Sequence, residues 1–426
     1  MHDCLGWPAR ELVARLARRE LRAQDVAQAF IERVHEREPQ VLAWQHFDAA
    51  QVLAQARALD EAPQAGALHG LPIGVKDLMD TCDMPTTYGS PIYAGHKPLV
   101  DAGCVAMARS AGALVMGKTV TTEFATFQPG PTRNPRAPLD APRTPGGSSS
   151  GSAAAVAAGM VPVAFGTQTA GSIVRPAAYC GVVGYKPTHG TLPLAGIKPL
   201  SPSLDTVGAI ARTVDDAAFL VGTLAGLPLA PQPIGRLRIG LCRTPHGDRA
   251  GDDTRRALQQ AADVLARGGA RVAEVILPDT FASLNAAQVD IMGHEAAAAF
   301  APELRTDSHL FSPAFAAVLA SGRQVDGLRF FAAQAQARAA RHALDAVFTQ
   351  VDILLAPSTE GIAPAGLEAT GDPVFNRMWS LLGNPCVHVP VGTGAHNMPV
   401  GVTLVAPAYH DAQALSAAHA LERALA

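Results

Sequence analysis

The sequence predicts an α/β protein built on a layered sheet. Short apolar runs with strand character, such as 73–75, 387–391 and 400–405, alternate with longer helix-like patterns. Strands that alternate with helices are typical of a layered α/β sheet. The chain has 426 residues, of which 48% are hydrophobic, so it is long enough to bury a substantial core.

The first third of the chain sets out this alternation. Leu12, Leu16 and Leu21 are spaced for one amphipathic face, and the pattern continues beyond them, so residues 1–60 are predicted to be helical. A short strand at 73–75 leads to Lys76, and a helix at 103–110 precedes a strand at 113–116. Residues 128–147 hold six prolines and are predicted to form a long surface loop.

The remainder continues in the same way. A helix is predicted at 152–158, and strands at 163–165, 182–185, 207–210 and 237–241. Residues 252–350 are rich in alanine and predict long helices at 255–267, 286–300 and 330–348. Strand character returns at 353–355, 387–391 and 400–405, and a helix at 412–425 closes the chain. The alanine-rich region carries few motif-like residues, and we expect it to shape substrate preference.

Charge and cysteine usage narrow the class of protein. The formal net charge is −3, which gives no electrostatic case for binding nucleic acid or an anionic membrane. The six cysteines are scattered without a CxxC pair, which indicates reduced thiols. The charged, amphipathic N-terminus is unlike a secretory signal peptide, and no apolar run is long enough to span a bilayer. We expect a cytoplasmic protein.

One stretch, residues 146–172, stands out for its content of glycine, serine and alanine. It begins GGSSSGSAAAVAAG and ends GTQTAGS, so two glycine-serine turns each carry a hydroxyl group. Glycine lets a ligand approach the main chain, and successive N–H groups in such a turn can hold negative charge. Upstream, Lys76 ends the uncharged run LPIGV. Burial would lower its pKa enough for the neutral amine to act as a base.

These motifs resemble the amidase signature family of serine hydrolases. The resemblance includes LHGLPIGVKD, GKTVTTEFA, PTRNP, PGGSSSGSAAAVAAG, GTQTAGS and CGVVGYKPTHG, in this order, with weaker similarity to both ends. It implies one amidase domain over 1–426, with an N-terminal helical segment at 1–60, a catalytic core at 66–215 and a substrate-shaping region at 252–350. The implied fold is a mixed sheet of many strands covered by helices on both faces.

The resemblance also implies the roles of individual residues. Ser172 would be the nucleophile, Ser148 a serine preceded by a cis peptide bond, and Lys76 the base of a Ser–cis-Ser–Lys triad. The backbone N–H groups of Thr169, Ala170, Gly171 and Ser172 would hold the oxyanion. An acyl-enzyme on Ser172 would release a carboxylate and ammonia or an amine, without a metal or cofactor. A homodimer is expected from the family alone.

Neighbouring polar residues have simpler explanations. Ser150 and Ser152 are expected to serve turn and helix-cap geometry, while Ser149 stays unassigned. G-S-S-S-G formally matches a nucleophile elbow centred on Ser149, but the proline-rich residues before it make a poor strand. We interpret His189, His294, His388 and Cys180 as structural.

The nucleophile motif departs from the family's usual DTGGSIR. Gln168 replaces the acid, Ala170 replaces a glycine, and Val174 stands where arginine is common, with Arg175 one position later. The lost carboxylate could change the hydrogen bonding of the loop or the pKa of Lys76. The shifted arginine gives no basis for predicting an acidic substrate.

Several functions compete. The first hypothesis is an amidase for small-molecule amides, and the alternative is the glutamine-hydrolysing subunit of a tRNA-dependent amidotransferase. A hydrolase of urea derivatives or carbamates, resembling an allophanate hydrolase, is a further alternative. A catalytically silent binding protein is disfavoured because Lys76, Ser148 and Ser172 are all present. Substrate-binding residues stay open, with Thr86, Tyr88, Gln128 and Trp379 as candidates.

Overall fold

A mixed sheet organises the protein, as predicted. The computed structural model describes residues 2–62, 66–233 and 235–426, and in this part of the chain eleven strands form one sheet in the order β1-β3-β2-β4-β6-β5-β10-β11-β9-β7-β8. The strands are β1 (Trp44–Phe47), β2 (Pro72–Lys76), β3 (Leu114–Thr119), β4 (Val163–Gln168), β5 (Val183–Lys186), β6 (Thr206–Ala211), β7 (Arg238–Cys242), β8 (Arg271–Val275), β9 (Ile353–Pro357), β10 (Cys386–Thr393) and β11 (Pro399–Val405). Neighbours pair in parallel within β3-β2-β4 and within β9-β7-β8, and the other pairs are antiparallel.

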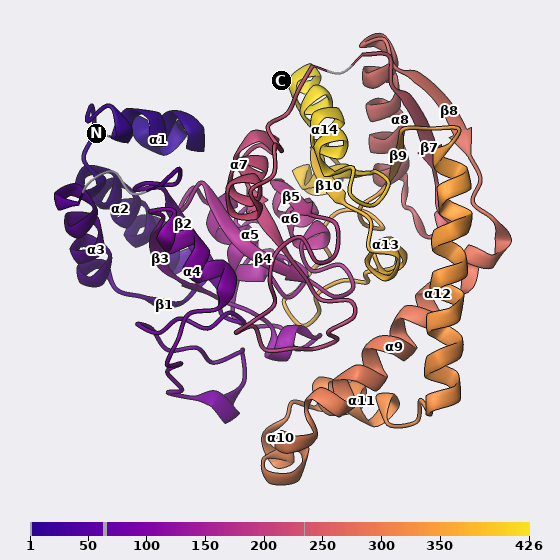
Figure 1. The fold of residues 1–426 in the computed structure, drawn as a ribbon, viewed down its shortest axis with the longest axis horizontal. Helices are drawn as coiled ribbons and strands as arrows, with labels where there is room; N and C mark the ends of the chain where they lie inside the picture. The colour runs from indigo at the N-terminus through magenta and orange to yellow at the C-terminus, as the bar shows by residue number, and fades with distance from the viewer. Residues whose placement is uncertain (1, 63–65, 234) are drawn as a thin grey trace.

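Helices cover both faces of this sheet (Figure 1). They are α1 (Ala9–Ala17), α2 (Ala23–Val41), α3 (Ala49–Glu61), α4 (Gly103–Ser110), α5 (Ser150–Ala157), α6 (Val174–Cys180), α7 (Val214–Ala225), α8 (Asp252–Arg267), α9 (Leu284–Ala299), α10 (Ala301–Thr306), α11 (Pro313–Gly322), α12 (Gly327–Phe348), α13 (Arg377–Leu382) and α14 (Asp411–Leu425). Helix α14 packs against α7 and α8, whereas α5 packs against α6. Helices α9 to α12 extend away from the sheet at the lower right of Figure 1, where α9 contacts both α11 and α12.

Two strands are missing from the sequence prediction. Strand β1 lies within residues 1–60, which were predicted to be wholly helical, and β8 lies within the alanine-rich region. Both are at the ends of the sheet, where one side of a strand has no neighbour. Strand β8 carries exposed charged residues, Arg271 and Glu274, and so lacks the apolar run that marks an interior strand.

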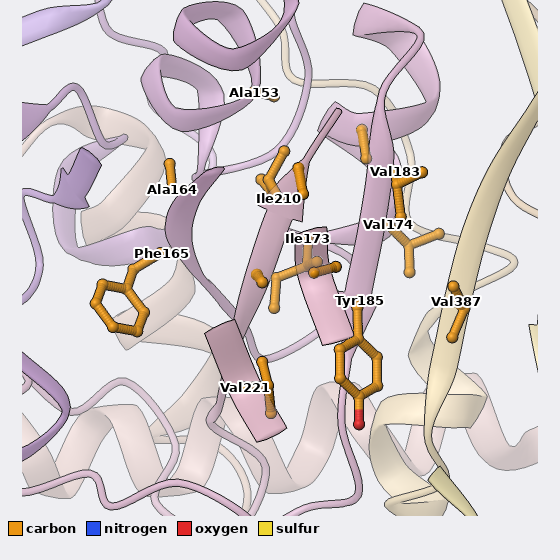
Figure 2. Close-up of a cluster of buried hydrophobic side chains, with 14 of the residues drawn as sticks. Ala153, Ala164, Phe165, Ile173, Val174, Val183, Tyr185, Ile210, Val221 and Val387 are labelled. Atoms are coloured by element: carbon orange, nitrogen blue, oxygen red, sulfur yellow. The ribbon is translucent and has the colours of Figure 1, made fainter. Parts of the chain in front are cut away.

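The centre of the sheet is packed with buried aliphatic side chains. Figure 2 shows Ile173, Ile210 and Val183 in this cluster, which is formed by β4, β5, β6 and the segment that precedes α6. Strands β2 and β4 run parallel through the centre and are buried along their whole length. Because parallel strands end at the same edge, Lys76 at the end of β2 and the loop after β4 meet there.

No described helix is both long enough and apolar enough to cross a membrane.

Candidate active site

Lys76 is the last residue of β2 and is completely buried. Its Nζ donates to Ser148 Oγ over 2.6 Å and to Thr167 Oγ1 over 2.7 Å. Burial holds the pKa of Lys76 well below the usual lysine value, although the charge of Asp205 acts in the opposite direction. The site therefore favours a neutral amine, which is the protonation state that a base requires.

Ser148 follows two glycines in left-handed conformations. Gly146 has φ of 81° and Gly147 has φ of 59°. A Cβ atom on Gly146 would come within 2.4 Å of the Tyr179 ring, and one on Gly147 within 3.1 Å of Ser172 Cα. The turn thus needs glycine for its backbone angles and for its close approach to Ser172. This approach lets the N–H of Ser148 donate to Ser172 Oγ over 3.1 Å.

The cis peptide bond expected before Ser148 is a wrong prediction. In the described part of the chain every peptide bond is trans. The two consecutive left-handed glycines turn the chain toward Ser172, so the contact with its hydroxyl forms with a trans bond.

The predicted oxyanion loop, Thr169 to Ser172, connects β4 to α6. Ser172 is 6% exposed, and within the described residues none of the four N–H groups of this loop donates a hydrogen bond to a protein acceptor. They are thus free to donate to a ligand. The next residue, Ile173, anchors the loop in the core shown in Figure 2. Its side chain packs over Gly166 and Gly208, where a Cβ atom would lie 3.2 Å and 2.9 Å from it.

Gln168 occupies the position at which the family usually has an acidic residue, and its side-chain amide forms hydrogen bonds within the nucleophile loop. Its Oε1 accepts hydrogen bonds from the N–H groups of Ile173 and Val174 over 2.9 Å and 3.1 Å. Its Nε2 donates to Ser380 Oγ, which in turn donates to the carbonyl of Ala170. The neutral amide therefore holds both ends of the nucleophile loop without adding a negative charge near Lys76.

Two carboxylates lie near the site. Asp205 accepts a hydrogen bond from Thr169 Oγ1 and two more from the N–H groups of Leu200 and Ser201. Burial raises its pKa to about 6. Asp77, the residue after Lys76, pairs with Lys118 over 2.9 Å, and both side chains are fully buried. The charge of Asp77 is thus already compensated beside the base.

The structure brings the predicted catalytic residues together and adds two that the sequence did not indicate. Thr167 contacts Lys76, and Asp205 orients Thr169. Thr167 belongs to the quoted motif GTQTAGS, but a threonine in a strand carries no local sign of such a contact. Asp205 lies 36 residues beyond Thr169 and has no motif of its own.

The structure shows the contacts of Ser149, which was left unassigned, and of Ser150 and Ser152, which were predicted to be structural. Ser149 Oγ bonds to the main chain of Thr167, and Ser152 Oγ donates to the carbonyl of Phe165. Ser150 begins α5 but makes no capping hydrogen bond, because its buried hydroxyl has no hydrogen-bond partner among the described residues. The predicted cap at Ser150 is therefore wrong.

The residues suggested as pocket-lining mostly serve other contacts. Thr86 accepts a hydrogen bond from Lys118, and the Tyr88 hydroxyl donates to Asp80. Trp379 is 1% exposed and packs in the core.

A possible ligand set for a metal lies elsewhere in the chain. Cys82, Asp83 and Asp101 form the one cluster of potential metal ligands found in residues 2–62, 66–233 and 235–426. Arg109 pairs with both carboxylates, over 2.7 Å and 3.1 Å. This cluster is therefore explained as an ion-pair network.

Comparisons with known proteins identify the family of the chain. The family model described as Amidase matches residues 25–415. A glutamyl-tRNA(Gln) amidotransferase subunit of Thermobifida fusca (strain YX) is 34% identical, over 100% of this chain and 97% of that protein. A crystal structure of an amidase has a TM-score of 0.88 at 31% identity, covering 98% of this chain and 99% of that one. The crystal structure of the corresponding glutamyl-tRNA(Gln) amidotransferase subunit from Thermotoga maritima has a TM-score of 0.82 at 28% identity, covering 99% and 95%.

The match spans nearly the whole chain and includes every motif that pointed to the site. The mixed sheet, too, is shared with solved amidase structures. This chain belongs to the amidase signature family and is an amide-hydrolysing enzyme.

Proposed function

We propose that the chain hydrolyses its amide substrate through an acyl-enzyme on Ser172. The observation that carries the proposal is the contact series from Lys76 Nζ to Ser148 Oγ, and from the Ser148 N–H to Ser172 Oγ. The base and the nucleophilic hydroxyl thus both contact Ser148, and the proposed relay adds one further contact during the reaction, between the Ser148 and Ser172 hydroxyls. The lowered pKa of Lys76 supports the same assignment.

The proposed steps use these groups. Ser172 Oγ attacks the amide carbon while its proton passes to Ser148 Oγ and the Ser148 proton passes to neutral Lys76. The oxyanion accepts hydrogen bonds from the N–H groups of the Thr169–Ser172 loop. Collapse of the intermediate breaks the C–N bond, and the proton held by Lys76 returns through Ser148 to the leaving nitrogen. Water then attacks the ester by the same relay and releases the carboxylate.

Two substrates are proposed for this chemistry. A small-molecule amide is supported by the likeness to the solved amidase structure, whose TM-score of 0.88 exceeds the 0.82 of the Thermotoga maritima protein. Glutamine is supported by the names of the curated relatives, which are subunits of glutamyl-tRNA(Gln) amidotransferases. These names favour the hypothesis of a glutamine-hydrolysing subunit over the hypothesis of an amidase for other small-molecule amides.

One experiment tests the mechanism and separates the substrates. Ammonia and amine release would be measured from glutamine and from aliphatic, aryl and urea-type amides, with wild-type protein beside Ser172→Ala and Lys76→Met. We expect turnover in the wild type and its loss in both variants, with folding checked by thermal melting. Retained activity in Ser172→Ala would overturn the mechanism.

The oligomeric state of the protein provides a further test between the two proposed functions. A stand-alone cytoplasmic amidase is expected to form a homodimer and to work without a partner. The glutaminase reading requires another protein chain to receive the ammonia. Light scattering of the purified chain, with activity measured in the same fractions, decides between them.

A further inference from the structure

A cavity of about 560 Å³ lies between α9, α11 and α13. Most of its wall is apolar, with Phe127, Val289, Met292, Ala314, Ala317 and Val318 among the lining residues. Two arginines, Arg377 and Arg329, also line it. None of the pocket-lining candidates from the sequence, Thr86, Tyr88, Gln128 and Trp379, is among its lining residues.

Arg377 connects this cavity to the nucleophile loop. Its Nη1 donates to Gln288 Oε1 over 2.7 Å, and Gln288 Nε2 donates to the carbonyl of Thr169 over 3.1 Å. Its guanidinium carbon lies 5.9 Å from the centre of the Phe127 ring, another wall of the cavity. One neutral side chain thus separates the guanidinium from the loop that carries Ser172.

The positive charge of Arg377 has no ion-pair partner among the described residues. Arg329, by contrast, pairs with Asp290 over 2.6 Å at the exposed edge of the same cavity. Asp372 is the acidic group that acts on Arg377, but it is paired with Arg249 over 3.2 Å. Burial holds the pKa of Arg377 below the usual arginine value, and the charge of Asp372 offsets this lowering only in part. Charges withdrawn from water are normally paired. Asp290 also lines the cavity but is paired with Arg329, so among the described residues Arg377 is left without such a partner.

A second guanidinium, which is fully buried, lies close to the same loop. Arg175 is 1% exposed, donates from Nε to the carbonyl of Thr370 over 2.8 Å, and has no described partner for Nη1. The positive charge of Arg377 acts on it unfavourably. The same Nη1 atom, and the unpartnered Oδ1 of Asn376, would lie 2.9 Å and 2.5 Å from a Cβ atom placed on Gly171. Two guanidinium groups that have no ion-pair partner in the described part of the chain therefore lie near the loop of the nucleophile.

We propose that this cavity binds the end of the substrate that is not cleaved, and that this end carries a carboxylate recognised by Arg377. The inference rests on the proposed acyl transfer at Ser172 and adds the chemical class of its substrate. The apolar wall accommodates a short hydrocarbon linker, and the guanidinium offers parallel N–H groups to a carboxylate. Arg175, held by Thr370 beneath the loop, adds positive potential but is not assigned contact with the substrate.

The kinetic test uses paired substrates that differ only in charge. Monoamides of succinic, glutaric and adipic acid would be compared with the corresponding methyl ester amides. In the wild type we expect kcat/KM for the best free acid to exceed that of its ester by about tenfold or more, as a charge-assisted hydrogen bond predicts. Arg377→Gln should bring the ratio of kcat/KM for the acid to kcat/KM for its ester down to about one, and Arg377→Lys should keep part of this preference.

Arg329→Gln is the matched control, because it removes an arginine at the edge of the same cavity whose charge Asp290 already neutralises. We expect it to keep the wild-type preference for the acid. Equal loss of the acid and ester rates in Arg377→Gln, or equal loss of preference in both variants, would overturn the assignment to Arg377.

A binding measurement separates this inference from the proposed function. Calorimetry with the Ser172→Ala protein would compare glutarate with glutaramide, and we expect glutarate to bind at least about tenfold more tightly, as a charge-assisted contact predicts. This preference should vanish in Ser172→Ala/Arg377→Gln. Amide turnover without any preference for carboxylates would refute the anion site alone. Arg377-dependent binding of glutarate without amide turnover would support the anion site and refute the proposed hydrolysis.

Discussion

Thr167→Val tests whether the second contact of Lys76 matters for the reaction. The substitution keeps the size and branching of the side chain but removes the hydroxyl that accepts a hydrogen bond from Lys76 Nζ over 2.7 Å. Both residues are buried, so water does not readily replace the lost acceptor. Leaving a buried donor unsatisfied costs about 1 to 3 kcal/mol. If this cost is added to the activation free energy because the amine is less well oriented, kcat should decrease by roughly 5- to 150-fold.

The pH dependence gives a second readout with a definite sign. A hydrogen bond to Thr167 stabilises protonated Lys76 more than the neutral amine, because bonds from charged donors are stronger. Removing it should lower the pKa of Lys76 further below its usual value. In the proposed mechanism neutral Lys76 is the active form, so activity should rise with pH through this pKa. The acidic limb of the kcat/KM profile should therefore move to lower pH in Thr167→Val.

Thr167→Ser is the matched control, because it keeps the acceptor and loses only a methyl group. We expect it to retain most of the wild-type kcat and the wild-type acidic limb. The measurement is steady-state ammonia release over a range of pH, with thermal melting to confirm folding. Wild-type kcat and pH profile in Thr167→Val, or equal impairment in both variants, would refute the reasoning.

Three further predictions concern buried polar groups around the sheet. Gln168→Ala removes the acceptor of two N–H groups at the start of α6, so urea unfolding should show a loss of about 2 to 5 kcal/mol, whereas Gln168→Glu should lose less. Lys118→Met leaves buried Asp77 unpaired and should cost about 3 to 5 kcal/mol, part of which Lys118→Met/Asp77→Asn should restore. Burial raises the pKa of Glu422 to about 7 in the folded protein. As pH rises above the lower pKa that Glu422 has in the unfolded chain, ionisation favours the unfolded state and lowers the free energy of unfolding, by about 3 kcal/mol at most. Glu422→Gln should consequently gain stability relative to wild type between pH 5 and 8 in thermal melts, and an unchanged difference would contradict this.

The amino-acid sequence alone was enough to identify the family and to predict most strands of the sheet. Lys76, Ser148 and Ser172 lie in glycine-rich motifs whose composition differs from that of an ordinary core. The interior strands were predicted because their residues are apolar on both faces, as β2 and β4 confirm. End strands such as β1 carry no such pattern, since polar residues there can face solvent.

The local geometry of the turn could not be read from its composition. Gly146 and Gly147 indicated a permissive backbone, but the same letters allow a cis peptide or two left-handed residues. Contacts with Tyr179 and Ser172 accompany the second arrangement in the structure. Ser150 is a similar case, because a serine at the start of a helix predicts a cap only if its rotamer reaches a free N–H group.

The sequence by itself indicated the chemistry that we propose, because Lys76, Ser148 and Ser172 lie in motifs that resemble those of an amide-hydrolysing family. Only the tertiary structure decided which side chains hold the nucleophile loop in place and which side chains line the neighbouring cavity. Gln168 reaches Ser380 across 212 positions of sequence, and Arg377 reaches Gln288 across 89. Such contacts depend on how α9 and α13 pack beside the loop after β4. An arginine or glutamine carries no local pattern that shows whether its side chain will make such a contact or stay solvated at the surface.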